Sequence, residues 1–270
     1  MGVRLAAAVA ALTVGVSPVD FLSSHQAPSG AFAESSGSSG PLLTAWAVLG
    51  LRAAGVGTGG ALQYLTTHEA ALPEVTDAEL VALAESVLGR RPSRLLVRIR
   101  GAQHSNGRIG PTVNSTVWGI LALRQAGERA PPAAVQFVLR QQARNGGWAW
   151  YLKGQPDSND TAAAIEALRS AGVTGKPIRR GLAYLHRLQN PDGGFELTPG
   201  RGSDAQSTAW AVQAFVAADR LAPKGSIAYL LRLRRPDGSF RYSKRYATTP
   251  VWVTAQVLPA LARKPFPLRR

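Results

Sequence analysis

The 270-residue sequence contains no cysteine, and this absence excludes disulfide bonds and thiolate zinc sites. It also lacks a glycine-rich phosphate loop and a Gly-x-Ser-x-Gly nucleophile turn, so two common catalytic motifs are missing. Charged residues make up only 17% of the chain, whereas hydrophobic residues make up 45%. This composition is too apolar for a disordered chain, and the length suffices for one large core.

Acidic residues are scarce, with 16 Asp and Glu against 31 Lys and Arg, which gives a net charge of +15. Such an excess raises the question of nucleic-acid binding. The basic residues are nevertheless scattered along the whole chain, and no aromatic–basic motif of a nucleic-acid module is present. We therefore expect a solvated basic exterior and no nucleic-acid partner. The alternative is weak association with an anionic membrane or envelope surface.

No apolar run is long enough to span a bilayer, and the most apolar one lies at the start of the chain, over residues 5–16. A positive start followed by a short apolar run is typical of a secretory signal. The sequence thus predicts a signal peptide over residues 1–17, one folded domain over residues 18–270 and an exported protein. If residues 1–17 instead form a helix of the fold, the prediction becomes a cytoplasmic protein.

A short turn of the form Gln-x-x-x-Gly-x-aromatic recurs along the chain. Complete copies are Gln26…Gly30…Phe32, Gln142…Gly146…Trp148 and Gln189…Gly193…Phe195, and partial copies are Gln103…Gly107…Ile109 and Arg234…Gly238…Phe240. A degraded copy, Glu69…Pro73…Val75, fills the long gap after the first. Glycine can take the left-handed conformation that stops a helix, and the aromatic ring can pack under the turn.

Each turn is followed by an apolar segment with a threonine near its start, which indicates a buried helix. The threonines are Thr44, Thr116, Thr161, Thr208 and Thr254, with Thr76 or Asp77 in the degraded copy. We interpret them as signals of helix N-termini. The segment before each turn carries arginines on one side, so we expect a half-exposed helix there. Six turns with two helices each predict an all-α protein of twelve helices.

These turns resemble the glutamine–tryptophan repeats of the alpha-alpha toroid proteins, which include squalene and terpene cyclases and protein prenyltransferase beta subunits. The resemblance covers about residue 18 to the end. It implies an (α/α)6 toroid of six helical-hairpin repeats, with six inner helices around a central cavity and six outer helices around those. An open solenoid of helical hairpins is the alternative.

Metal and cofactor chemistry is not predicted. The prenyltransferases bind zinc through Asp, Cys and His, and that set is incomplete without cysteine. The four histidines occupy similar positions at the ends of predicted outer helices and do not converge; they are His25, His68, His104 and His186. We expect no metal site and no cofactor.

The segment Asp157-Ser-Asn159-Asp160-Thr161-Ala resembles the Asp-x-Asp-Asp-Thr-Ala motif of class II terpene cyclases. In the family, the third position supplies the acid that protonates an alkene or epoxide. Asn159 stands there, and an amide cannot release that proton, which argues against cyclisation by this route. Asp160 or Asp157 is the candidate substitute, and helix capping is the simpler interpretation of both. If the protein is an enzyme, the resemblance implies a terpene cyclase-like isomerase or lyase acting on a polyprenyl substrate.

Four tryptophans lie close to the recurring threonines and are candidates for a common cavity wall: Trp46, Trp118, Trp210 and Trp252. Rings at one level of several inner helices can stabilise a cationic intermediate, and ordinary packing is an equal alternative. Asp204 is a further candidate at the cavity rim. The last residues, Lys264 to Arg270, form a basic segment with two prolines, and we expect it to have little to pack against.

Three functions remain open. The first is an exported toroid that binds a small apolar ligand, and the resemblance implies an isoprenoid. Whether this toroid also catalyses a reaction stays open, because Asn159 replaces the family's acid. The second is a binding module for another small molecule, similar to cobalamin carriers. The third is a structural or protein-interaction ring. The size and polarity of the space inside the inner helices distinguish them.

Overall fold

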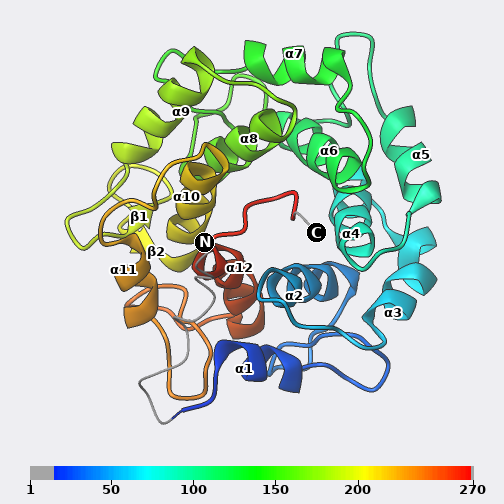
Figure 1. The fold of residues 1–270 in the computed structure, drawn as a ribbon, viewed down its shortest axis with the longest axis vertical. Coiled ribbons are helices and arrows are strands. Elements are labelled where there is room, and N and C mark those ends of the chain that lie inside the picture. Colours follow the sequence, from blue (N-terminus) through cyan, green and yellow to red (C-terminus); the bar gives the residue numbers. More distant parts are fainter. Residues whose placement is uncertain (1–14, 269–270) are drawn as a thin grey trace, which may run out of the picture.

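The computed structural model describes residues 15–268, and within this range the chain forms two concentric rings of helices (Figure 1). The inner helices have 13 residues each: α2 (Pro41–Ala53), α4 (Val75–Val87), α6 (Val113–Gln125), α8 (Ser158–Ser170), α10 (Ala205–Ala217) and α12 (Pro250–Ala262). The outer helices are α1 (Pro18–Ser24), α3 (Ala61–His68), α5 (Ser93–Gly101), α7 (Pro132–Arg140), α9 (Lys176–His186) and α11 (Ser226–Arg232). A 3-10 helix, η1 (Glu69–Ala71), follows α3, and two short antiparallel strands, β1 (Phe195–Glu196) and β2 (Ser203–Asp204), precede α10.

Each inner helix packs against the next one along the chain, and α12 packs against α2. The ring is therefore closed, as Figure 1 shows, and the open solenoid is excluded. The predicted all-α class and toroid architecture are confirmed. No helix within residues 15–268 is long and apolar enough to span a membrane.

The recurring threonine joins each turn to the inner helix that follows it. The N–H of the aromatic or Ile residue of the turn donates to the threonine hydroxyl at 2.8–3.0 Å in five turns. These threonines are fully buried and lie one turn inside their helices. They lie near the starts of their helices, as the sequence predicts, and the caps at α6, α8 and α10 are Thr112, Asp157 and Asp204. The hydroxyl is needed because a buried N–H without an acceptor costs free energy.

The turn glutamines connect neighbouring outer helices. The Nε2 atom of Gln189 donates to the carbonyl of Gly193 in its own turn and to Lys224 just before α11. Gln26 and Gln142 make the same pair of bonds in their turns. Gly193 has a φ of 85° and lies close to Gly225. A Cβ atom on Gly193 would approach the carbonyl oxygen of Gly225 to 2.6 Å.

The same junction closes the outer ring through the start of the described chain. Gly238 lies against the carbonyls of Val16 and Ser17, and Arg234 donates to the Val16 carbonyl at 2.9 Å. Ser17 also caps α1 by accepting from the N–H of Asp20. The predicted signal peptide falls mostly on residues 1–14, outside the described residues, but residues 16 and 17 belong to this junction.

The first N–H groups of several inner helices bond to the loop of the neighbouring hairpin. The carbonyl of Trp150 accepts from the N–H groups of Val113 and Asn114 at the start of α6. The carbonyls of Leu197 and Tyr242 accept in the same way from the first N–H groups of α8 and α10. At α12 the carboxylate of Glu34 takes this role, accepting from Val251 and Trp252 at 3.0 and 2.9 Å. A helix leaves its first N–H groups without partners. For α6, α8 and α10 the loop of the next hairpin supplies the acceptor, and for α12 the first hairpin supplies it.

Replacing Thr208 by Val tests the bond between turn and inner helix. Val keeps the shape but leaves the N–H of Phe195 without its acceptor, so we expect a loss of about 1–3 kcal/mol in the free energy of unfolding. Urea denaturation followed by circular dichroism measures this loss. Thr248→Val, at an exposed position, is the matched control and should change stability by less than about 0.5 kcal/mol. Equal stability of the two variants would show that the bond is dispensable.

Candidate functional site

The N-terminal turns of all six inner helices surround a cavity of about 410 Å³. Four tryptophans from four helices line it: Trp46 of α2, Trp118 of α6, Trp210 of α10 and Trp252 of α12. Asp157, Asn159 and Asp160 line it from the start of α8. Sequence-predicted residues that are far apart in the chain therefore lie around one space, because parallel inner helices bring equivalent positions to the same level.

Asp204 lies elsewhere. It caps α10, where its carboxylate accepts from the N–H and the hydroxyl of Ser207 at 2.7 and 2.8 Å. Burial raises its pKa to about 6, against the lowering effect of these hydrogen bonds. Asp204 is not among the residues that line the cavity with the tryptophans.

The inner wall of the cavity is a cluster of three tryptophans packed edge to face. The ring centroids of Trp46, Trp118 and Trp210 lie 5.5–6.1 Å apart with interplanar angles of 88–89°. Such edge-to-face contacts are favourable for aromatic rings and hold them in fixed orientations. Trp210 is also oriented by Gln256, whose Oε1 accepts from the indole N–H at 3.0 Å.

The three residues of the Asp157 segment have different environments. Asp157 caps α8 by accepting from the N–H of Asp160 at 2.8 Å, as the capping interpretation predicts. Asn159 accepts a long bond from Ser158. Asp160 does not cap the helix: its Oδ1 accepts from Nδ2 of Asn114, on α6, at 2.7 Å.

Burial raises the pKa of Asp160 well above its usual range, and the nearby charge of Asp157 adds to this effect. The hydrogen bond from Asn114 acts in the opposite direction but does not cancel the burial. Asp160 therefore favours its neutral form, which can donate a proton, beside an aromatic wall. This property depends on burial of the side chain in the closed ring, which sequence reasoning could not locate.

Two further polar atoms at the cavity have no partner in the described chain: Oδ1 of Asn114, an acceptor, and Nε2 of Gln256, a donor. Both side chains are more than nine-tenths buried and both residues line the cavity. The sequence analysis missed them, although each lies on an inner helix within two residues of a recurring threonine.

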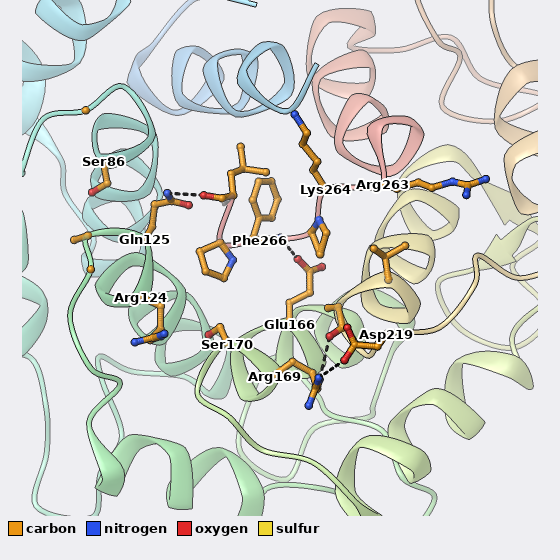
Figure 2. Close-up of a pocket in the computed structure, with 18 of the residues that line it drawn as sticks. Ser86, Arg124, Gln125, Glu166, Arg169, Ser170, Asp219, Arg263, Lys264 and Phe266 are labelled. Carbon is orange, nitrogen blue, oxygen red and sulfur yellow. Dashed lines mark hydrogen bonds and ion pairs between the residues drawn. The ribbon is translucent and has the colours of Figure 1, made fainter. Parts of the chain in front are cut away.

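A second and larger space, of about 810 Å³, lies at the C-terminal ends of inner helices (Figure 2). Residues 263–268 enter it, with Phe266 and Leu268 only 2% and 4% exposed. The expectation that this segment has little to pack against was wrong, because it follows α12 back into the ring. The carboxylate of Glu166, at the centre of Figure 2, accepts from the N–H of Phe266 at 2.5 Å.

The comparisons with known proteins agree with this architecture. Residues 161–249 match the prenyltransferase alpha-alpha toroid domain. The structure superposes on the type II terpene cyclase MstE from Scytonema, solved with its substrate geranylgeranyl dihydroxybenzoate, with a TM-score of 0.62, 17% identity and coverage of 91% of this chain and 94% of that one. The protein is an alpha-alpha toroid.

Two further proteins are similar to this chain. Protein geranylgeranyltransferase-I of Candida albicans, complexed with GGPP, matches with a TM-score of 0.63 and 13% identity over 82% of the toroid and 83% of that chain. Drimenyl diphosphate synthase of Streptantibioticus cattleyicolor is 40% identical over 129 residues, which are 44% of the toroid and 23% of that protein. The toroid thus matches less than a quarter of this curated relative. The predicted resemblance is confirmed.

The raised pKa of Asp160 predicts a pH-dependent stability. A carboxyl group that holds its proton more tightly in the folded state stabilises fully below the unfolded pKa of about 3.9, and this contribution is lost as pH rises toward the folded pKa. Asn carries no charge, so the difference in melting temperature between Asp160→Asn and the original protein should increase from pH 4 to pH 8. Differential scanning calorimetry measures it.

The control for this experiment is Asp219→Asn, at a carboxylate whose side chain is 80% exposed and pairs with Arg169 at 2.6 Å. Its difference in melting temperature should not rise with pH. Parallel curves for Asp160→Asn and the original protein would contradict a raised pKa at Asp160.

Proposed function

We propose that the toroid binds a small apolar ligand of the isoprenoid class in the cavity of about 410 Å³. The observation that carries the proposal is the convergence of four tryptophans from four inner helices on one space. The volume lies within the range of small-molecule sites, about 300–1,000 Å³, and tryptophan rings share the lining with polar side chains that can orient a ligand. Structural neighbours that bind geranylgeranyl compounds support the ligand class.

Polar groups from several inner helices line the site and define what the ligand needs there. Asp160, Asn114 and Gln256 come from α8, α6 and α12 and offer a carboxyl group, an amide acceptor and an amide donor. A buried polar atom without a partner costs free energy, so a ligand hydroxyl or ether oxygen near them would be favourable. We infer a mostly apolar ligand that carries at least one oxygen atom.

A second candidate function is proton-initiated cyclisation, favoured by the neutral form of Asp160. Its carboxyl proton would form a C–H bond with one alkene carbon of the ligand, leaving a carbocation on the other carbon and a carboxylate on Asp160. The N–H of Asn114 would stabilise that carboxylate, and the indole faces would stabilise the cation. The π electrons of a second alkene in the same chain then attack the cation and close the ring. The final cation loses a proton to water, and solvent returns a proton to the Asp160 carboxylate.

Ligand binding is tested with farnesol and geranylgeraniol by native mass spectrometry and tryptophan fluorescence. We expect a retained one-to-one complex, and Trp252→Leu should weaken it about tenfold because part of the aromatic wall is lost. Tyr64→Leu, on outer helix α3 and away from the cavity, is the control and should bind normally. Ligand-free spectra at all concentrations would refute the binding function and favour an interaction ring.

The chemistry is tested by incubating farnesol, geranylgeraniol and its diphosphate with the protein and analysing products by gas chromatography and mass spectrometry. We expect cyclised products that Asp160→Asn reduces at least about a hundredfold, as for a general acid. Asp204→Asn makes the same chemical change at a capping residue and should keep most activity. Cyclisation by Asp160→Asn at the normal rate would remove Asp160 from the mechanism.

A further inference from the structure

Residues 264–268 occupy the axis of the ring opposite the tryptophan-lined cavity. The chain leaves α12 through Arg263, which has a left-handed backbone with φ of 53°, and then runs inward between the inner helices (Figures 1 and 2). The inserted sequence, Lys-Pro-Phe-Pro-Leu, is mostly apolar. It therefore fills the kind of space that an apolar ligand would otherwise take.

Two hydrogen bonds from side chains of inner helices hold this segment at defined positions. Glu166 of α8 accepts from the N–H of Phe266, and Nε2 of Gln125 on α6 donates to the carbonyl of Leu268 at 3.0 Å. Figure 2 shows the two side chains reaching the segment from two sides. Glu166 is fully buried, and its other carboxyl oxygen has no partner in the described chain. The segment is thus a specific part of the packed ring.

The ring of Phe266 packs directly against the inner wall of the ligand cavity. Its centroid lies 6.3, 6.5 and 5.9 Å from those of Trp46, Trp118 and Trp210. The three tryptophans, with Phe266 packed behind them, therefore separate the cavity of about 410 Å³ from the larger space of about 810 Å³. Closely packed rings of this kind move little while their backing is intact.

We propose that the segment 264–268 is a stopper that sets the depth of the ligand cavity and limits the ligand to a short isoprenoid chain. The inference rests on the proposed binding function and specifies its substrate class. With Phe266 in place, a longer chain meets the tryptophan cluster. Without it, the tryptophans lose their backing, and the axis of the ring becomes available to the far end of a longer chain.

The test is a graded series, Phe266→Leu, Phe266→Val and Phe266→Ala, titrated with farnesol, geranylgeraniol and the much longer solanesol. The original protein should bind the short prenols and exclude solanesol. Affinity for solanesol should rise along the series, reaching at least about tenfold in Phe266→Ala, while affinity for farnesol changes by less than about twofold. Circular dichroism identifies the variants that fold. Either of the two smaller substitutions, Phe266→Val or Phe266→Ala, is sufficient for the test if that variant folds.

Quenching of tryptophan fluorescence by acrylamide without ligand gives a second readout, and it should increase along the same series because the tryptophan cluster becomes accessible. Leu231→Ala, at a half-exposed position on outer helix α11, is the control and should change neither quenching nor chain-length preference. If the original protein binds farnesol and the length preference stays constant along the series, the stopper is refuted and the binding function stands. If the original protein binds no prenol, both are refuted.

Discussion

Shared hydrogen bonding between neighbouring hairpins is the constraint on which the ring depends. Inner helices begin with N–H groups that their own hairpins do not satisfy, and the loop of the next hairpin supplies the acceptor. A linear array would leave the last helix without this partner. Glu34 provides it from the first hairpin, so closure satisfies polar groups that an open arrangement would expose or bury unpaired.

Closure in turn creates the candidate site. The inner helices run in the same direction, so equivalent positions from distant parts of the chain lie at one level around the axis. Small residues on the inner helices allow close packing, as at Gly50, where a Cβ atom would approach the backbone of Ala255 to 2.6 Å. The large side chains then concentrate on the axis, where tryptophan and Phe266 form a compact aromatic layer with a cavity beside it.

Several carboxyl groups are buried in the apolar interior of the ring, and their pKa values are raised. Burial raises the pKa values of Glu79, Glu166 and Asp160, and Glu79 has no hydrogen-bond partner at either oxygen in the described chain. Each favours the neutral form, since a charge in an apolar interior costs more than a neutral carboxylic acid. Only Asp160 among these three lines the aromatic cavity, which distinguishes a group that can react with a ligand from groups that only pack.

The repeat itself was readable in the sequence because its parts act locally. A left-handed glycine, a ring under the turn and an apolar helix recur at regular spacing, and they predicted the helices, their alternation and the buried rings of Trp148, Phe195 and Phe240. The cavity tryptophans and the Asp157 segment could also be predicted as candidates, because position within a repeat fixes the level of a residue in the ring.

The sequence by itself determined the hairpins and the level of each residue around the axis. Only the tertiary structure decided which groups meet there: Asn114 with Asp160, Glu34 with α12, and Phe266 with the tryptophan cluster. The physical reason is that local signals depend on backbone geometry within a few residues. Contacts between residues up to 218 positions apart depend instead on closure of the ring and on which side chains fill its centre.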